Sequence, residues 1–425
     1  MALVVAKFGG TSVASPDRIQ MVAKRLIEAK QAGNQVVAVV SAMGKTTDEL
    51  LGLARALNAS PTAREMDMLL STGEQVSMAL LAMAIQARGY SAKSYTGWQA
   101  GITTDSFHGR AKIEDIAAYR IKEELDRGTI VIVAGFQGIT AVGDITTLGR
   151  GGSDTTAVAL AYALKADVCE IYSDVDGVYT ADPRVAPRAQ KLSEICYDDM
   201  LELSNAGAGV LQARAVEFAR KFGVVIHSRS AFSSQAGTLI KETISMEHAV
   251  ISGIAHDTSE VRVTLCNVVD TYGVAAQVFS ALAASSINVD MIIQNTSHNG
   301  ETDISFTCPD SDLDRARETV ERMMPKIGFS TYEVDTNIAK VSLVGTGMKS
   351  SPGVAAKTFE ALAQAHVNIL MISTSPIRLS VVIEAEQVTK AVRALHTAFN
   401  LDSESVYEET MLSAEEIAAK MQKGR

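Results

Sequence analysis

Four residues near the N-terminus, Gly9-Gly10-Thr11-Ser12, have the composition of a phosphate-binding turn. They follow an apolar run, Leu3 to Phe8, that favours a buried strand, and Ser15-Pro16 after them is typical of a helix start. Glycines let backbone N–H groups approach an anion, and the helix N-terminus favours negative charge at the same point. Lys7 would add a mobile positive charge. For a lone glycine pair, a plain strand-to-helix turn with a solvated lysine is the favoured explanation.

A second glycine-rich stretch, Gly149-Arg150-Gly151-Gly152-Ser153-Asp154-Thr155-Thr156, stands before a helix expected over Ser153 to Lys165. The Arg150 guanidinium could hold a carboxylate through two parallel hydrogen bonds. Asp154 could orient the reacting centre or help to hold a metal ion. A helix cap uses the same small and acidic residues, but it needs neither the arginine nor a third glycine. The stretch therefore favours a binding site over a cap alone.

The segment Val39-Val40-Ser41-Ala42-Met43-Gly44 predicts a second strand end beside the first. Ligands of open α/β sheets bind at the carboxyl ends of the strands, so Ser41 would face phosphate and Thr47 could bond a polar substrate. Judged alone, Thr46-Thr47-Asp48 is better explained as a helix cap. Gly44-Lys45-Thr46 is not a P-loop, because that motif needs a glycine where this chain has Val39.

Two further segments carry polar groups to the expected sheet edge. Ser71-Thr72-Gly73-Glu74 precedes an apolar helix, expected over Val76 to Arg88, and places the Glu74 carboxylate in its first turn. That carboxylate either complements the helix dipole, worth about 0.3–1 kcal/mol, or binds an ammonium group. Ser173 to Arg184 follows a strand expected over Val168 to Tyr172. It is a polar turn by itself, but here it could carry the base and ribose of a nucleotide.

The composition is that of an ordinary globular chain with two or three domains: 425 residues, 47% hydrophobic and 21% charged. A net charge of −10 without a basic run argues against nucleic-acid binding. The four cysteines predict neither disulfides nor a zinc site, and we expect them to be buried. The seven histidines form no metal-spaced pair. We find no leader segment and no apolar run of membrane-spanning length, so we expect a cytoplasmic protein without a membrane partner.

Residues 1 to about 240 alternate short β-branched runs with longer helical stretches. This pattern favours an α/β domain on a mostly parallel sheet with helices on both faces. Further elements are expected at the following positions: strands over Val36 to Val40, Thr129 to Val133 and Val224 to Ile226, and a helix over Asp17 to Gln31.

The second half contains an internal repeat. The stretch from Gly273 through Met291-Ile292 recurs from Gly353 through Met371-Ile372, at a constant offset of 80 residues. A β-rich segment precedes each copy, Val261 to Val269 or Ala339 to Val344. Two βαββαβ units that pack on each other or on a second chain are therefore predicted. We expect Ile240 to about Glu260 to be the connection.

Together, Lys7 to Ser12, Val39 to Gly44, Ser71 to Glu74 and Leu148 to Asp154 resemble the aspartate kinases of the amino-acid kinase superfamily. The resemblance spans nearly the whole chain, and the repeats look like ferredoxin-like ACT domains, which bind amino-acid effectors. It implies ATP- and Mg²⁺-dependent phosphorylation of the side-chain carboxylate of L-aspartate, on the route to lysine, threonine and methionine. The implied domains are a catalytic domain over 1–245, a linker and first ACT domain over 246–337, and a second ACT domain with a tail over 338–425.

The resemblance also implies roles for individual residues. Lys7 and Asp154 would be catalytic, and ATP would contact Lys7, Phe8, Gly9, Gly10, Ser41, Ser173, Asp174, Tyr179, Asp182, Arg184, Gly209 and Val210. Aspartate would contact Thr47, Glu74, Arg150, Gly151, Gly152 and Ser153. Effectors would lie between ACT units of two chains, against Asp270, Gly273, Ala275, Asp290 and Gln294 of the first copy and Asn368, Ile369 and Ser375 of the second. This arrangement implies at least a dimer, and no residue is assigned to a metal.

Three residues depart from the family pattern. Gly209 stands where members usually carry a lysine associated with nucleotide phosphates. Either the missing cation weakens ATP binding, or Lys45, Lys221 or Arg184 substitutes for it, and the sequence does not decide between the two. Tyr272 replaces a proline of the first ACT loop, and Pro376 replaces a residue that is commonly acidic. Both lie near the expected effector pocket, so the sequence leaves open whether lysine, threonine or their mixture inhibits.

Two other functions stay open. One is a kinase of the same superfamily that acts on another carboxylate, such as glutamate or N-acetylglutamate, although a glutamate placed for an ammonium would not suit an acylated amine. The other is an amino-acid sensor with an inactive kinase domain, motivated by Gly209. We also expect that Met246, at the domain connection, could start a separate regulatory chain.

Overall fold

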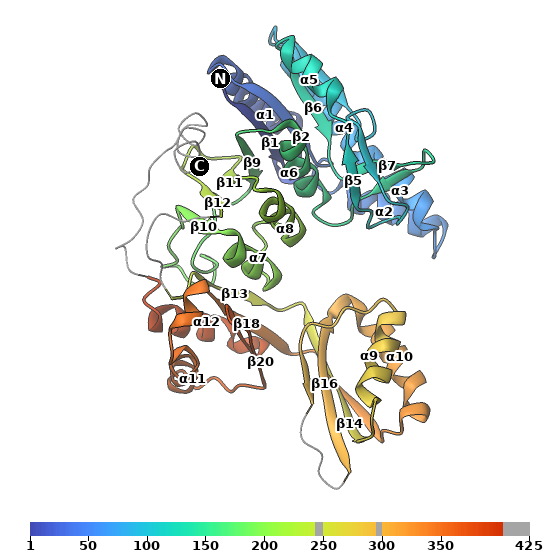
Figure 1. Cartoon of the computed structure of the whole chain (residues 1–425), viewed down its shortest axis with the longest axis vertical. Helices are drawn as coiled ribbons and strands as arrows, with labels where there is room; N and C mark the ends of the chain where they lie inside the picture. The colour runs from blue at the N-terminus through green and yellow to red at the C-terminus, as the bar shows by residue number, and fades with distance from the viewer. Residues whose placement is uncertain (243–249, 295–299, 403–425) are drawn as a thin grey trace.

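The computed structural model describes residues 1–242, 250–294 and 300–402, so Met246 lies outside the described residues. Figure 1 shows a large α/β domain and two smaller lobes built from the second half of the chain. The large domain is centred on an eight-stranded sheet. Its strands, in spatial order, are β10 (Glu194–Cys196), β12 (Thr238–Lys241), β11 (Ile226–Ser230), β9 (Val168–Ser173), β1 (Leu3–Phe8), β2 (Gln35–Val40), β6 (Ile130–Ala134) and β3 (Ala92–Tyr95).

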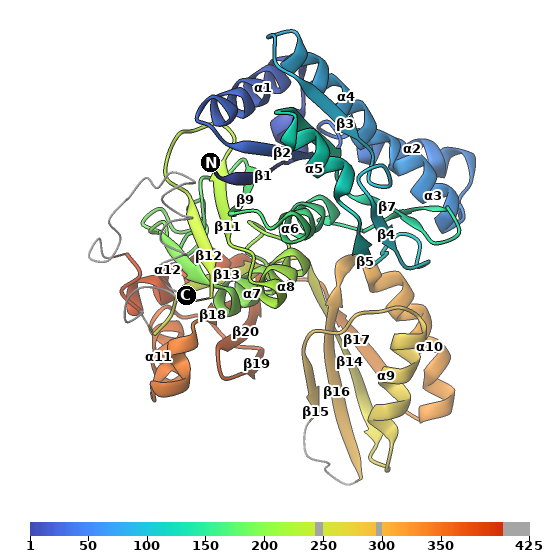
Figure 2. The same cartoon turned by 45° about the horizontal axis from the view of Figure 1, so that its top comes forward.

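Neighbouring strands of this sheet run parallel except β11 and β12, which confirms the predicted sheet type. Successive residues of a strand point to opposite faces, so Val4 and Phe8 pack on one face and Val5 on the other. Helices α1 (Pro16–Gln31) and α4 (Thr72–Gln86) cover the first face. Helices α5 (Tyr119–Asp126), α6 (Gly152–Leu164), α7 (Tyr197–Asn205) and α8 (Ala213–Phe222) contribute to the core on the second (Figure 2).

The loops at the carboxyl ends of the strands carry additional structure. Gly10–Val13 forms one 3₁₀ turn between β1 and α1, and the Ser15 side chain caps α1 by accepting from Arg18 N, as its position predicts. Two helices follow β2, namely α2 (Thr46–Leu57) and α3 (Ala63–Leu70). The sequence analysis did not predict the small second sheet, whose spatial order is β5 (Ile113–Ile116), β4 (Ile102–Thr104), β7 (Gln137–Thr140) and β8 (Ile145–Thr147).

Two expectations about apolar segments need correction. Helices α3 and α4 together form a run, Ala63–Gln86, that is long and apolar enough to cross a membrane, whereas no such run was expected. Within its most apolar window 56% is buried in the domain, as in the core helix of a globular protein. The strand expected over Val224 to Ile226 begins only at Ile226. Of the four cysteines, Cys169 and Cys308 are buried, but the other two are only half-buried.

The first repeat forms a complete βαββαβ unit, called here the first ACT unit. It consists of β14 (Glu260–Val269), α9 (Val274–Ala284), β15 (Ile292–Gln294), β16 (Glu301–Pro309), α10 (Leu313–Ile327) and β17 (Thr331–Asp335). The sheet order is β15-β16-β14-β17. Its helices lie on one side of the sheet in both views (Figures 1 and 2).

The second repeat, called here the second ACT unit, takes one strand from before the first. Its own elements are β18 (Ile338–Val344), α11 (Val354–Gln364), β19 (Met371–Thr374), β20 (Arg378–Glu384) and α12 (Val388–Ala398). The fourth strand is β13 (Gly253–Asp257), which pairs with β18 in the order β13-β18-β20-β19. The segment expected to be a plain connection, Ile240 to Glu260, therefore contains a strand. Residues 253–257 belong to the sheet of the second ACT unit, although the predicted domain division places them with the first ACT domain.

Candidate active site

The ends of β1 and α6 meet in a buried ion pair. Lys7 Nζ lies 2.6 Å from Asp154 Oδ1, and the two side chains are only 12% and 9% exposed. The contact is an ion pair without the alignment of a hydrogen bond. Helix α6 has Gly151 as its N-cap and no side-chain cap. The interpretation of Asp154 as a plain helix cap is therefore wrong, and its carboxylate instead holds the Lys7 ammonium.

The loops after β1 and β2 touch, as their sequences predict. A β-carbon at Gly10 would lie 2.8 Å from the Ala42 carbonyl oxygen, so a larger residue would push the loops apart. Gly44 N donates to the Gly10 carbonyl oxygen at 3.0 Å. Helix α2 begins at Thr46 after Lys45, without a side-chain cap, so interpreting Thr46-Thr47-Asp48 as a cap is also wrong. Thr47 is half-buried in the first turn of α2.

Glu74 is a buried carboxylate with one unused oxygen. It lies in the first turn of α4, as predicted, and is only 3% exposed. Oε1 accepts from Ala42 N at 3.0 Å, whereas Oε2 is buried without a hydrogen-bond partner. Burial raises the pKa of Glu74 to about 7. Such an unsatisfied group needs an explanation, and groups with perturbed pKa values concentrate at functional sites.

The loop that carries Arg150 is fixed from behind while Arg150 itself is exposed. Arg214, at the start of α8, donates to the carbonyl oxygens of Leu148 and Ala111 at 2.7 Å each. These two bonds join α8 to the segment that leads into Gly149 and Arg150. Arg214 is not among the residues predicted from the sequence, because nothing local distinguishes it from other helical arginines.

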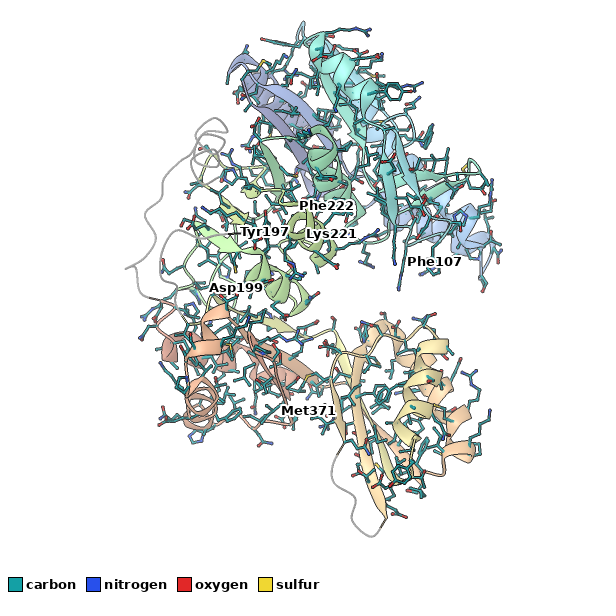
Figure 3. All side chains as sticks on the ribbon, viewed as in Figure 1. Phe107, Tyr197, Asp199, Lys221, Phe222 and Met371 are labelled. Carbon is teal, nitrogen blue, oxygen red and sulfur yellow. The ribbon has the colours of Figure 1, made fainter. Side chains whose placement is uncertain are left out.

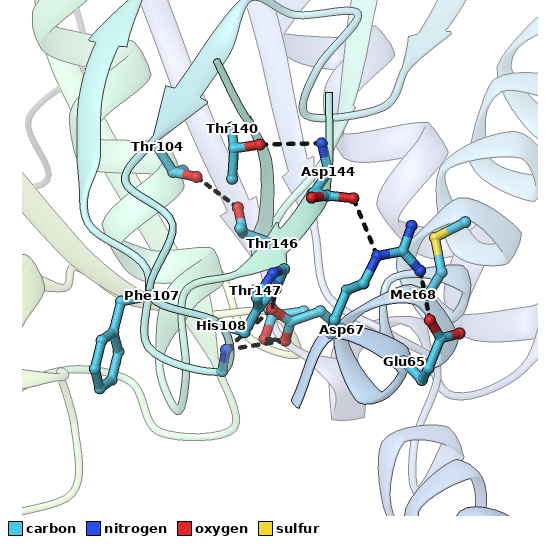
Figure 4. Close-up of polar contacts among 12 residues, drawn as sticks. Glu65, Asp67, Met68, Thr104, Phe107, His108, Thr140, Asp144, Thr146 and Thr147 are labelled. Atoms are coloured by element: carbon cyan, nitrogen blue, oxygen red, sulfur yellow. Dashed lines mark hydrogen bonds and ion pairs between the residues drawn. The ribbon is translucent and has the colours of Figure 1, made fainter. Parts of the chain in front are cut away.

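A buried aspartate on α3, Asp67, holds the other side of the same loop (Figure 4). Its carboxylate is 1% exposed and accepts from Thr147 Oγ1 at 2.5 Å and from Gly109 N at 3.0 Å. His108 Nδ1 lies 2.8 Å from Asp67 Oδ2. The sequence analysis missed Asp67 as well, although an acidic residue inside the apolar run Met66 to Leu70 was a signal. Asp67 ties α3 to the end of β8, three residues before Arg150.

The segment expected to hold the nucleotide base follows β9, which pairs with β1. Gly9 N donates to the Tyr172 carbonyl oxygen at 3.3 Å, so this segment begins next to the glycine turn. Tyr179 donates through its hydroxyl to Asp176 Oδ1 at 2.8 Å. Arg184 is paired with Asp182 at 2.8 Å, and its hydrogen bonds lower the pKa of Asp182. Ser173 and Asp174 form part of a polar turn at the end of β9.

The backbone conformation at residue 209 explains why a glycine stands there, but it supplies no positive charge in place of the usual lysine. Its φ of +65° lies in the left-handed region that favours glycine. Among the suggested substitutes, Arg184 is engaged by Asp182, and Lys221 lies over the Phe222 ring at 5.2 Å (Figure 3). Lys45 is exposed and directly follows Gly44, which contacts the Gly10 loop. Lys45 is therefore next in the chain to a residue that contacts the Gly10 loop.

The residues expected to bind effectors are spread over both ends of the ACT sheets. Asp270, Gly273 and Ala275 lie around the β14–α9 turn, where Asp270 N donates to the Gly300 carbonyl oxygen before β16. Asp290 precedes β15 and its N–H donates to the Thr307 carbonyl oxygen, near the other end of β16. Gln294 is the last residue of β15, and Asn368, Ile369 and Ser375 flank β19. Asp290 Oδ2 is 2.5 Å from Lys340 Nζ, and Lys340 also pairs with Glu260. Glu260 and Lys340 are equivalent positions of the repeat, so this pair links the two units within one chain.

The comparisons with known proteins agree with this architecture. The chain matches the model of the amino acid kinase family over residues 2–228 and the ACT domain model over 247–324 and 341–399. Fold and matches thus define an amino-acid kinase with ACT domains. An aspartokinase from Mycolicibacterium smegmatis is 54% identical over 96% of this chain and 98% of its own length. The chain belongs to the aspartokinase family, as its sequence resemblance predicts.

Solved structures give the same answer. Aspartokinase III from E. coli in complex with aspartate and ADP, in the R-state, has a TM-score of 0.78 and 26% identity, covering 93% of this chain and 99% of that one. The same enzyme in complex with lysine and aspartate, in the T-state, has a TM-score of 0.76 at 26% identity and the same coverage. The predicted fold class is therefore confirmed.

Proposed function

We propose that this chain transfers the γ-phosphoryl group of ATP to the side-chain carboxylate of L-aspartate, giving ADP and 4-phospho-L-aspartate. The observation that carries the proposal is Glu74, whose buried Oε2 lacks a partner beside the loops of Ala42 and Gly10. An ammonium group on the acceptor would supply that partner. Membership in the aspartokinase family supports the same reaction.

The reaction needs positioning more than covalent help from the protein. A carboxylate oxygen of aspartate attacks the γ-phosphorus, the bond to the oxygen bridging the β- and γ-phosphorus breaks, and ADP leaves with that electron pair. The acceptor is already an anion, so no general base is needed, and alignment and charge stabilisation supply the catalysis. Lys7 would stabilise charge on the transferring group, and Asp154 would fix the Lys7 ammonium there through their 2.6 Å ion pair.

Aspartate would be held at three points. Glu74 would bind the ammonium group, Arg150 the α-carboxylate, and the hydroxyl of Thr47 would add a hydrogen bond. The exposed Arg150 is free to reach a ligand, whereas its loop is fixed by Asp67 and Arg214. An acceptor with an acylated amine would leave Glu74 buried and unpaired. The site therefore favours a free amino acid.

We infer that ATP binds with Mg²⁺, which supplies positive charge to the phosphates. Magnesium is usually held by one or two carboxylates together with substrate phosphates rather than by a protein cage. Asp154, buried at the start of α6, is the carboxylate that fits this role best. Among the described residues no group of three or more His, Cys, Asp or Glu is placed to hold a metal.

Regulation is proposed at the ACT units. Lysine, threonine or both would bind between ACT units of two chains, against Asp270 and Asp290 of the first copy and Asn368 of the second. The resulting assembly would be at least a dimer, and Met246 would be an internal start for a separate regulatory chain. The intact masses of the chains in the native host test the last point, because a single full-length species would exclude it.

The experiment that tests the proposed function is ADP release from ATP·Mg²⁺ with L-aspartate, L-glutamate or N-acetyl-L-aspartate as acceptor. We expect turnover with L-aspartate and at least 100-fold less with N-acetyl-L-aspartate, on the order of the 2–5 kcal/mol that an unpaired buried charge costs. Each assay is repeated with lysine, threonine and their mixture to identify the effector. Saturable lysine or threonine binding without any turnover would instead support the amino-acid sensor.

A further inference from the structure

A fully buried carboxylate, Asp199, connects the catalytic domain to the second ACT unit. Asp199 lies in the first turn of α7 and has 0% exposure. Its Oδ1 accepts from Thr346 N at 2.9 Å and its Oδ2 accepts from Ser252 Oγ at 2.5 Å. Thr346 follows β18 and Ser252 precedes β13, so both donors belong to the second ACT unit. Figure 3 shows Asp199 at the boundary between the two bodies.

Other residues of α7 face the same unit. Glu202 Oε2 lies 3.2 Å from Arg378 Nη1 on β20. The Leu203 side chain packs against Gly253, where a β-carbon would lie 3.3 Å from Leu203 Cδ2. Helix α7 is therefore held on one side by strands β13 and β20 of one sheet and by the turn that follows β18. Any shift of the second ACT unit must either move α7 or break these buried contacts.

Helix α7 leads directly into residues 207–210, which we call the nucleotide loop. Gly207 has a φ of +104°, and a β-carbon there would lie 2.5 Å from the His256 carbonyl oxygen of β13. The loop is thus pressed against the same strand whose preceding residue, Ser252, binds Asp199. It contains Gly209 and Val210, two residues expected to contact ATP. Asp199 is about 9 Å from the end of α7, at 1.5 Å per residue.

The second ACT unit also contacts the other segment that is expected to bind the nucleotide. Thr180 Oγ1 is 2.9 Å from His396 Nε2 of α12, and the Thr180 carbonyl oxygen accepts from Ile254 N at 2.8 Å. Ala181 and Ala186 are buried in the hydrophobic core of that unit. Tyr179 and Asp182 lie directly beside these contacts in the chain. Both segments that are expected to bind the nucleotide are therefore packed on the second ACT unit.

We propose that Asp199 is a positioning residue for ATP, through which the second ACT unit sets the place of the nucleotide loop. The proposal rests on the proposed kinase function, because it assumes that the loop contacts ATP. It predicts that loosening Asp199 weakens ATP binding and leaves aspartate binding nearly unchanged. It also predicts that the contact carries part of any effector response to the nucleotide side of the site.

Three substitutions separate this role from general stability. Asp199→Ala removes both acceptors, so the half-buried Thr346 N–H and Ser252 hydroxyl lose these partners. Asp199→Asn is the conservative variant, because its amide oxygen can accept from Thr346 N while its NH₂ group donates to Ser252 Oγ. Asp198→Ala is the matched control on the same turn, since Asp198 is about half exposed and forms its ion pair with Arg220, at 2.7 Å, within the catalytic domain.

The experiment measures KM for ATP and for aspartate separately, on the full-length chain, together with the melting temperature of each variant. For Asp199→Ala we expect KM for ATP to rise at least about tenfold, equal to ~1.4 kcal/mol, while KM for aspartate changes less than about twofold. Asp199→Asn should restore most of the ATP affinity, and Asp198→Ala should resemble the wild type. If an effector inhibits the wild type, Asp199→Ala should also weaken that inhibition.

Two results would overturn the proposal. One is a lower melting temperature for Asp199→Ala with both KM values unchanged, which would make Asp199 only a packing residue. The other is an equal rise in both KM values, which would indicate general loosening of the site. If Asp199→Ala does not fold, Ser252→Ala removes one donor alone, and it must then raise KM for ATP selectively. Absence of aspartate-dependent turnover in the wild type would refute the proposed function instead, so the two failures are distinguishable.

Discussion

Replacing Glu74 with glutamine should stabilise the folded chain while it abolishes aspartate recognition. Burial raises the pKa of this carboxyl from its usual 4.5 to about 7. Between pH 4.5 and about pH 7 the Glu74 carboxyl keeps its proton in the folded chain and loses it in the unfolded chain. The free energy of unfolding therefore falls as the pH rises through this window. Above pH 7 the loss levels off. At ~1.36 kcal/mol per pKa unit, the full loss is about 3 kcal/mol.

Glu74→Gln removes this pH dependence, because glutamine does not ionise. The amide oxygen can still accept from Ala42 N, and the cost of burying its NH₂ group is the same at every pH. The variant-minus-wild-type difference in unfolding free energy should therefore grow by about 2.5 kcal/mol between pH 5 and pH 8. Denaturant unfolding across this range measures it. Glu65→Gln is the matched control for the loss of one carboxylate, since Glu65 lies on α3 with a side chain that is 63% exposed.

The same substitution should raise KM for aspartate at least 100-fold, on the order of the 2–5 kcal/mol lost with a buried charge pair. KM for ATP should change little. In the wild type, kcat/KM for aspartate should increase with pH up to about 7 as Glu74 ionises in the free enzyme. A flat stability difference, or a variant that binds aspartate normally, would refute the assignment of Glu74 to the ammonium group.

Three further substitutions test other parts of the site. Lys7→Met should lower kcat by about 10²–10³, and it should cost about 3–5 kcal/mol of unfolding free energy because Asp154 loses its partner; ADP release and denaturant unfolding measure the two effects. Asp67→Ala should raise KM for aspartate several-fold with KM for ATP nearly constant, because the Thr147 and Gly109 donors that fix the Arg150 loop lose their acceptor. Gly10→Ala should weaken ATP binding about tenfold or more, equal to ~1.4 kcal/mol, because the new methyl group would lie 2.8 Å from the Ala42 carbonyl oxygen. Calorimetric titration with a non-hydrolysable ATP analogue measures this affinity. An unchanged affinity would contradict the phosphate-binding role of the Gly10 loop.

Much of the catalytic fold could be predicted because its signals are local. In β2, every residue after Gln35 is apolar and buried, which is typical of strands buried on both faces of a parallel sheet. Ser15 and Pro16 mark the start of α1 without any tertiary information. The strand β13 could not be found this way, because it is short and pairs with β18, which lies about 80 residues later in the chain.

The site could be predicted only in part, because its contacts join residues that are far apart in the chain. Sequence placed Glu74 in a first turn, but the Ala42 loop that packs on Gly73 and bonds Glu74 lies 32 residues earlier in the chain. The alternatives for Asp154, a cap or a functional carboxylate, could be separated only by the ion pair with Lys7. Asp67 was missed because its three partners come from loops 40 to 80 residues away.

The most direct test of the proposed reaction is to trap its product. An acyl phosphate reacts with hydroxylamine, so the wild-type chain incubated with ATP·Mg²⁺, L-aspartate and hydroxylamine should form aspartate β-hydroxamate, identified by mass spectrometry, in equal amount to the ADP released. Formation of ADP without the hydroxamate, or of a hydroxamate only from another acceptor such as L-glutamate, would contradict the proposed transfer to the aspartate side chain.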